Sequence, residues 1–236
     1  MIKYARRSLR GFVDEVVVPL IQYIHYKIPG TTVLRELEKR TAVECADYAQ
    51  ARMQAALQFE RKEDLWNHAL GKAPNGLLVE FGVWNGKSIN HIARRSTPAI
   101  VYGFDSFEGL REDWSGWKET KGAFNRGGRL PKVEANVRLV KGWFDATLPQ
   151  FLSDHSGPFA FVHFDGDTYE SAKTILDLVG PRLVVGTVLV FDEYFGYRGW
   201  KIGEYRAWQE FVRKWGIEYE YLAFSDQPVA LRIARK

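Results

Sequence analysis

Cysteine is nearly absent from this sequence, which excludes a fold held together by disulfides. Cys45 is the single cysteine among 236 residues, so no internal disulfide can form. Disulfides accumulate in oxidising compartments, so a chain without them is typical of a reducing setting, and we expect a cytoplasmic protein. Cys45 lies in a stretch with a helical pattern, and we expect it to be packed rather than catalytic.

Long apolar runs and a strong net charge are also missing. No run reaches the roughly 18 to 20 residues that a membrane-spanning helix needs. The formal net charge of +4 is too small to indicate a nucleic-acid partner, and we expect none. A hydrophobic fraction of 46% and a charged fraction of 26% are typical of a globular protein. The length suits one large α/β domain with an N-terminal appendage.

Charge is unevenly distributed in residues 1–30, where basic residues precede an apolar stretch. The basic residues are Lys3, Arg6, Arg7, Arg10 and Lys27, and the acidic ones are Asp14 and Glu15. This pattern is compatible with peripheral membrane contact or with a partner-binding segment, such as a contact between two copies of the chain. The sequence favours a third alternative, a helix packed on the domain or on a second subunit.

The pattern of the chain changes near residue 71. Pro29–Gly30 is a turn signal, and residues 32–70 have a helical, charge-laced pattern. From residue 76 onward, short β-rich runs alternate with helical stretches, which predicts βαβ units and a parallel sheet. We therefore predict an N-terminal helical segment over residues 1–70 and an α/β domain over residues 71–236.

Seven runs have the pattern of strands: 77–83, 100–106, 137–142, 159–165, 187–192, 219–224 and 229–234. Helical patterns lie between most of them, at 88–95, 148–155, 169–178 and 203–215. The first five strands are continuous apolar runs, as expected when helices cover both faces of a sheet. The last two are joined by a short connector, which predicts an antiparallel pair. This doubly wound, seven-stranded, mostly parallel sheet with a terminal antiparallel hairpin is typical of class I methyltransferases, and residues 113–128 suggest a mobile lid.

The first strand runs into a glycine-containing turn before a helix, which predicts a ligand site. Glu80, Gly82, Gly86 and Ser88 have the spacing E-x-G-x-x-x-G followed by a helix start. Glycines allow a sharp turn and close approach of the backbone to a ligand, and a helix N-terminus adds free N–H groups. The spacing departs from G-x-G-x-x-G, so the pyrophosphate fingerprint of nicotinamide enzymes is missing.

Ligand-type residues also end the second and third strands. Asp105 and Ser106 end the second strand, where an acid can accept hydrogen bonds from ribose hydroxyls. Trp143 and Phe144 follow the third strand and could flank an adenine ring. An N-cap role for Asp105 and a core role for the two aromatic residues are the alternatives. Three successive strand ends of this kind predict a nucleoside-type cofactor.

Carboxylates end the fourth and fifth strands. Asp165 follows the fourth strand, and Asp192 with Glu193 follow the fifth. Parallel neighbours present their ends side by side, and three adjacent carboxylates repel one another unless a cation binds or a proton is shared. Oxygen ligands in this number suit Mg²⁺, Ca²⁺ or Mn²⁺. The sequence therefore predicts a divalent-cation site, and it treats Asp167 as a candidate cap of the following helix.

Five segments together resemble the macrocin/mycinamicin-type sugar O-methyltransferases. They are residues 79–86 (VEFGVWNG), 104–110 (FDSFEGL), 141–144 (KGWF), 163–171 (HFDGDTYES) and 190–194 (VFDEY). The resemblance implies transfer of a methyl group from S-adenosylmethionine to a sugar hydroxyl, with Mg²⁺ or Mn²⁺ bound by Asp165, Asp192 and Glu193. It also implies that Asp165 is the catalytic base. Glu193 departs from the family, which usually has an aspartate there, and residues 1–40 and 111–129 have no clear counterpart.

The sequence thus favours an O-methyltransferase acting on a glycan, a sugar or another polyhydroxylated small molecule. A nicotinamide-dependent reductase is the enzymatic alternative, but it leaves the acids at the fourth and fifth strands unexplained. A non-catalytic, membrane-associated scaffold with the same fold is the alternative from another class.

Overall fold

The computed structural model describes residues 12–20 and 32–236, which belong to two compact units, Met1–Arg40 and Thr41–Lys236. In the first unit, residues 12–20 are helical around η1 (Val13–Val17), and α3 (Val33–Arg52) begins. The side chains of Phe12, Val16 and Leu20 are exposed. Residues 1–11 and 21–31 lie outside the described residues. The structure therefore bears on the three predicted roles of residues 1–30 (membrane contact, partner binding or packing) only at residues 12–20.

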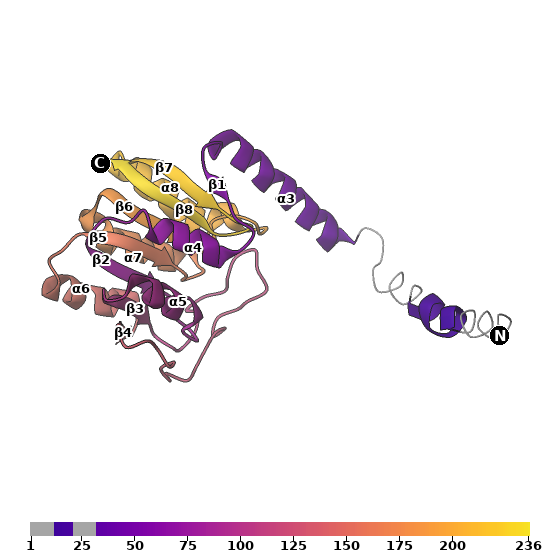
Figure 1. The fold of residues 1–236 in the computed structure, drawn as a ribbon, viewed down its shortest axis with the longest axis horizontal. Helices are drawn as coiled ribbons and strands as arrows, with labels where there is room; N and C mark the ends of the chain where they lie inside the picture. The colour runs from indigo at the N-terminus through magenta and orange to yellow at the C-terminus, as the bar shows by residue number, and fades with distance from the viewer. Residues whose placement is uncertain (1–11, 21–31) are drawn as a thin grey trace, which may run out of the picture. The chain divides into compact units, whose positions relative to one another are not determined.

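The second unit is built on one eight-stranded sheet with the order β1-β7-β8-β6-β5-β2-β3-β4 (Figure 1). The strands are β1 (Leu57–Gln58), β2 (Leu77–Phe81), β3 (Val101–Asp105), β4 (Val137–Lys141), β5 (Phe159–Phe164), β6 (Leu183–Phe191), β7 (Glu218–Phe224) and β8 (Val229–Arg235). Strands β2 to β6 pair in parallel, and β8 pairs antiparallel with both β6 and β7. All seven predicted strands and the antiparallel end are confirmed, and the two-residue edge strand β1 is additional.

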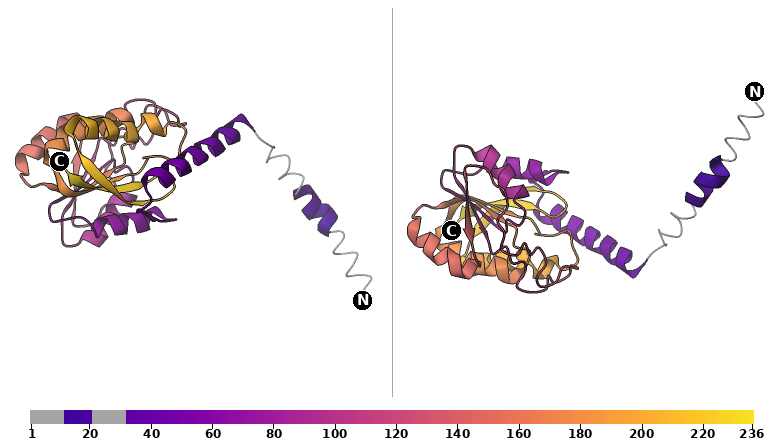
Figure 2. Two further views of the ribbon diagram at one scale, coloured as in Figure 1. Left: turned by 90° about the horizontal axis from the view of Figure 1, so that it is seen from above. Right: turned by 90° about the horizontal axis from the view of Figure 1, so that it is seen from below.

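Helices cover both faces of this sheet (Figure 2). They are α4 (Lys62–Leu70), α5 (Lys87–Ser96), α6 (Phe144–Asp154), α7 (Tyr169–Val179) and α8 (Glu204–Trp215), with short 3₁₀ turns at η2 (Gly180–Arg182) and η3 (Trp200–Ile202). One core contains buried side chains of α4 and α5, and the other contains those of α6, α7 and α8. Strand β5 is buried at every position because neighbouring residues face opposite cores.

The second unit begins well before the boundary predicted at residue 71. Strand β1 pairs in parallel with β7, and α4 packs its buried residues Leu65 and Trp66 into the core shared with α5. These contacts make residues from Thr41 onward part of the compact α/β unit. Residues 41–70 escape this prediction because an amphipathic covering helix has the same sequence pattern whether or not a sheet lies beneath it.

The topology brings the carboxyl ends of the parallel strands to one edge of the sheet. Strand β2 lies between β3 and β5, so the chain changes direction across the sheet at this point, where α/β proteins bind ligands. Residues 106–136, between β3 and β4, form no helix or strand. The predicted movement of residues 113–128 as a lid stays a prediction. Among the described residues, no helix is both long and apolar enough to cross a membrane.

Candidate active site

A cavity of about 370 Å³ opens at the carboxyl ends of the parallel strands. The structure brings all but two of the predicted site residues to its lining: Gly82, Ser88, Asp105, Ser106, Trp143, Phe144, Asp165, Asp192 and Glu193. Glu80 and Gly86 do not line it. One cavity therefore contains both the predicted cofactor residues and the predicted carboxylates.

The loop after β2 has the backbone geometry that its glycines predict. A Cβ atom on Gly82 would lie 1.7 Å from the carbonyl oxygen of Asp165, so only glycine allows β2 and β5 to approach this closely. Gly86 has a left-handed φ of 83° and precedes α5 as its N-cap residue. Gly86 therefore shapes the turn into α5, and its contact with a cofactor stays a prediction.

Asp105 holds two loops together at the rim of the cavity. Its Oδ2 accepts hydrogen bonds from the backbone N–H groups of Val83 at 2.9 Å and Trp84 at 2.7 Å. Its Oδ1 accepts one from the N–H of Phe107 at 2.6 Å. A carboxylate has about four acceptor positions, so the side chain keeps capacity for a ribose hydroxyl. Asp105 thus fixes the loop after β2 as well as facing the cavity.

Glu80 lies behind the cavity in a fully buried contact. The Ser88 hydroxyl donates to its Oε1 at 3.0 Å, and His163 Nδ1 donates to its Oε2 at 2.9 Å. Burial raises the pKa of Glu80, and the interaction with His163 opposes that rise. Glu80 is fully buried, and these contacts position the start of α5. Direct binding of the cofactor by Glu80 stays a prediction.

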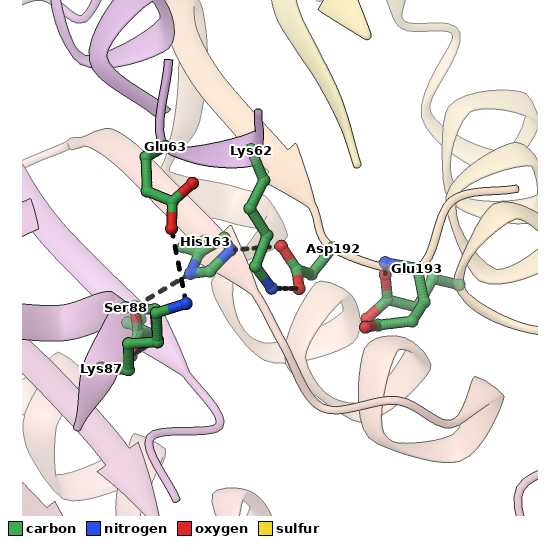
Figure 3. A network of polar contacts seen from close by, with 9 residues as sticks. Lys62, Glu63, Lys87, Ser88, His163, Asp192 and Glu193 are labelled. Carbon is green, nitrogen blue, oxygen red and sulfur yellow. Dashed lines mark hydrogen bonds and ion pairs between the residues drawn. The ribbon is translucent and has the colours of Figure 1, made fainter. Parts of the chain in front are cut away.

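A row of alternating charges extends from Glu80 through His163 and Asp192 to Lys62 on α4. Figure 3 shows the part of this row from His163 to Lys62. His163 Nε2 lies 3.4 Å from Asp192 Oδ1, and Lys62 Nζ donates to Asp192 Oδ2 at 2.8 Å. Burial lowers the pKa of His163, but hydrogen bonds to Asp192 and Glu80 and the charges of both carboxylates outweigh it and raise that pKa to about 10. His163 is therefore an imidazolium between two carboxylates, and both oxygens of Asp192 have cationic partners.

Sequence reasoning missed His163 and Lys62. A signal for His163 exists, because a histidine inside the fully buried run of β5 needs partners on both ring nitrogens. Nothing in the sequence points to Lys62, because its contact with Asp192 depends on how α4 packs near the ends of β5 and β6.

The carboxylates of the cavity form two overlapping groups. Oxygen atoms of Asp165, Asp167 and Glu193 lie within 4.8 Å of one another, and a second group joins Asp165 and Asp192 to His163. The predicted trio of Asp165, Asp192 and Glu193 is thus divided, with Asp165 common to both groups. Asp167 is the missed member. It has a left-handed φ of 64°, and the cap of α7 is Thr168, whose hydroxyl accepts from the N–H of Ser171 at 3.2 Å.

The electrostatics of this cluster favour a bound cation. Burial and the nearby charge of Asp192 raise the pKa of Asp165 to about 8. Burial and neighbouring carboxylates also raise the pKa of Asp167, of Glu193 and of the adjacent Glu204. Two buried oxygens, Glu193 Oε2 and Glu204 Oε1, have no hydrogen-bond partner. A hard dication would satisfy such oxygens and reverse the repulsion, so these residues fit Mg²⁺ or Mn²⁺.

The end of β4 carries the residues predicted to flank a base. Trp143 is the N-cap residue of α6, and the Arg111 guanidinium lies 4.2 Å from the centre of its ring. Arg111 also forms two hydrogen bonds to Asp145, at 2.9 and 3.0 Å. This arrangement ties the irregular segment after β3 to the end of β4, and the sequence analysis did not identify Arg111 or Asp145.

Comparison with known proteins points to one class. Residues 79–194 match a family model described as a methyltransferase domain. An 8-demethyl-8-(2,3-dimethoxy-alpha-L-rhamnosyl)-tetracenomycin-C 4'-O-methyltransferase of Streptomyces olivaceus is 32% identical, over 50% of this chain and 53% of that protein. A demethyldecarbamoylnovobiocin O-methyltransferase of Streptomyces niveus is 29% identical, over 58% of this chain and 61% of that protein. The chain therefore spans less than two thirds of the length of either relative.

Among solved structures, the calicheamicin methyltransferase CalS11 has a TM-score of 0.58 at 23% identity, over 72% of this chain and 77% of that one. The sheet order and this likeness define a class I methyltransferase fold. Residues 79–194, which include the ends of β2 to β6, match this methyltransferase-domain model, in agreement with the resemblance in the sequence.

Proposed function

We propose that this chain transfers a methyl group from S-adenosylmethionine to a hydroxyl of a sugar, a glycan or another polyhydroxylated small molecule, with a divalent cation bound beside the acceptor. One observation carries the proposal: a single cavity joins the ends of β2, β3 and β4 to the carboxylate cluster of β5 and β6. The names of the two sequence relatives support O-methylation as the reaction.

The cofactor side of the cavity would hold the methyl donor in a fixed orientation. Asp105 would accept hydrogen bonds from the ribose hydroxyls, while Ser106, Trp143 and Phe144 lie where the base would bind. The Gly82 turn and the start of α5, with Ser88, would face the amino-acid part of the donor. Methyl transfer from a sulfonium is an in-line displacement, and alignment of the reacting groups can contribute several kcal/mol, up to roughly 7 to 11.

The acid side would orient and activate the acceptor. Asp165, Asp167 and Glu193 would hold the cation, with Asp192 fixed beside them by Lys62 and His163. A divalent cation supplies charge neutralisation and lowers the pKa of an acceptor hydroxyl when bound. Asp165 would take the hydroxyl proton, since it lies in both carboxylate groups at the centre of the cluster.

Binding and activity assays test this function. Thermal shift with S-adenosylhomocysteine, with NADH and without ligand separates the methyltransferase from the reductase and from the non-catalytic scaffold. We expect stabilisation by S-adenosylhomocysteine alone. Mass spectrometry of a glycoside pool incubated with labelled methyl donor should then detect a methylated product, and stabilisation by NADH alone would contradict the proposal.

Peripheral membrane contact is a second proposal, supported by the exposed side chains of Phe12, Val16 and Leu20 beside a basic sequence. Deleting residues 1–30 should abolish sedimentation with anionic liposomes and leave cofactor binding intact. An intact protein that ignores anionic liposomes would favour packing or a contact between two copies of the chain.

A further inference from the structure

A groove of about 740 Å³ lies against β7, on the side of that strand where β1 is its neighbour in the sheet. We call it the tyrosine groove, after Tyr48, Tyr205, Tyr219 and Tyr221 in its lining. Strand β1 is two residues long and pairs with the last residues of β7, which leaves room beside the rest of this strand. Among the described residues, the groove shares no lining residue with the cavity of the proposed active site.

Tyrosine hydroxyl groups converge at one wall of the tyrosine groove. The Tyr221 hydroxyl lies 2.6 Å from that of Tyr48 and 2.7 Å from that of Tyr194. The hydroxyl of Tyr219 is its third neighbour, at 3.2 Å. Burial raises the pKa of Tyr48, Tyr194 and Tyr221, so these phenols keep their protons at neutral pH. The hydroxyls are therefore hydrogen-bond donors.

This cluster has more protons to donate than internal contacts that use them. A phenol has one proton, and its oxygen also accepts hydrogen bonds. Tyr221 has three hydroxyl neighbours, so it donates to one of them and accepts from the other two. The neighbour that accepts from Tyr221 has its own O–H left to donate elsewhere. Gln209 is a further donor, because its Nε2 donates to Tyr194 at 3.3 Å and to Tyr219 at 2.9 Å. The wall therefore favours a ligand rich in acceptors.

Basic side chains without anionic partners line the same groove. They are Arg52 and Lys72, neither of which has an ion-pair partner among the described residues, and the half-buried His68. Burial and the nearby charge of Lys72 lower the pKa of His68, as expected where positive charge is not offset. The carboxylate in the lining, Glu220, already accepts from Arg232 at 2.6 Å. The basic residues of the active-site cavity differ, since each of them faces a carboxylate.

We propose that the tyrosine groove binds a phosphate ester of a ring-shaped small molecule, at a site separate from that of methyl transfer. Arg52 and Lys72 bind the phosphate oxygens, since unpaired guanidinium and ammonium groups are common phosphate ligands. Arg52 follows Tyr48 by one helical turn on α3, so the phosphate lies beside the tyrosine hydroxyls. A volume of about 740 Å³ is far larger than a phosphate ion, and the tyrosine rings offer aromatic surface to the rest of the molecule.

Calorimetric titration of the full-length protein tests this site, with phenyl phosphate as the probe. The protein is first dialysed against EDTA and then against chelator-free buffer, so that no divalent cation in the active-site cavity can bind the probe. One phenyl phosphate should bind per chain with a dissociation constant below about 1 mM. Inorganic phosphate, which lacks the ring, should bind at least about threefold more weakly. Phenyl β-glucoside, which lacks the charge, should not bind.

Variants locate the bound phosphate. Arg52→Ala and Lys72→Ala should each weaken binding of phenyl phosphate about tenfold or more, because each removes a charge-assisted hydrogen bond. Arg52→Lys should restore part of the affinity, since it retains the charge. Both residues are exposed, so the melting temperature without ligand should stay unchanged. Arg213→Ala is the matched control, because Arg213 is exposed on α8 and does not line the groove, and it should bind the probe as the wild type does.

A lipid headgroup is the other source of a phosphate group, and sedimentation with phosphatidic-acid vesicles distinguishes it. Sedimentation that the double variant Arg52→Ala/Lys72→Ala abolishes, with no binding of phenyl phosphate, would assign the groove to a lipid and overturn the small-molecule ligand. Equal affinity for inorganic and phenyl phosphate, or unchanged affinity in the double variant, would also overturn the proposal. An equal loss of affinity in Arg213→Ala would reduce the binding to general charge attraction.

Discussion

The two sides of the cavity differ in how completely their polar groups are satisfied within the chain. On the cofactor side, Asp105 accepts three backbone hydrogen bonds that shape the loop after β2. On the acid side, Glu193 and Glu204 each have a buried oxygen without a partner. The cofactor side is therefore organised by the fold alone, whereas the acid side has buried oxygens that a bound cation would satisfy. The buried contact of Glu80 with His163 joins the two sides.

The largest effect is expected where the two sides are joined. Glu80→Ala removes one partner of a buried ion pair and leaves the His163 imidazolium with a single carboxylate. Breaking such a pair costs about 3 to 5 kcal/mol, so the free energy of unfolding should fall by that amount in chemical denaturation. Glu134→Ala is the control: its pair with Arg94 is exposed, so the loss should stay below about 1 kcal/mol. An equal loss of unfolding free energy in the two variants would contradict the proposal that the Glu80–His163 pair joins the two sides of the cavity.

Asp105→Ala tests the organised side. The change removes the proposed ribose contacts and frees the N–H groups of Val83 and Trp84. Hydrogen bonds to charged groups contribute roughly 1.5 to 3 kcal/mol each, so affinity for S-adenosylhomocysteine should fall at least about tenfold by calorimetry. Metal-dependent stabilisation of the same variant should persist. An unchanged cofactor affinity would exclude Asp105 from the cofactor site.

The pH dependence of stability tests the acid side without added metal. The pKa of Asp165 is raised from 3.8 to about 8, and that of His163 from 6.5 to about 10. In both cases the folded protein retains a proton that the unfolded chain releases, so stability is lost as pH rises through these intervals. The melting temperature should therefore fall by several degrees between pH 6 and pH 9. Saturating Mg²⁺ should reduce this fall, and a melting temperature that rises with pH would contradict the account.

The smallest effect on stability and cofactor binding is expected at the ion pair between Arg111 and Asp145, at the rim of the cavity. Arg111 and Asp145 are both more than half exposed, so their ion pair contributes little to stability. Arg111→Ala should change the melting temperature by less than about 2 °C and weaken cofactor binding less than about threefold. A tenfold loss of cofactor affinity would instead show that Arg111 holds Trp143 in position.

Most of the fold and the composition of the cavity are predictable from the sequence, because strand periodicity and parallel topology determine which strand ends meet. Asp105, Asp165 and Asp192 are found this way. The site residues that the sequence does not predict depend on tertiary packing. Lys62 contacts Asp192 from α4. Asp167 adopts a left-handed backbone conformation and joins the carboxylate cluster. Glu80 shows a different limit of the sequence pattern. Its place at a strand end predicts ligand contact, but its side chain lies inside the core against His163.

One paired measurement tests most directly the claim that the two sides differ: S-adenosylhomocysteine affinity and methyl-transfer turnover, each with excess EDTA and then with Mg²⁺ restored. The account predicts that cofactor affinity changes less than about twofold, while turnover stops in EDTA and returns with Mg²⁺. Asp167→Asn should resemble chelation, because it removes one charge from the three carboxylates that would hold the cation. Glu193→Asp should keep part of the activity, because it retains the charge with a shorter reach. Full turnover of the wild type in excess EDTA, with no metal in the purified protein, would contradict the account.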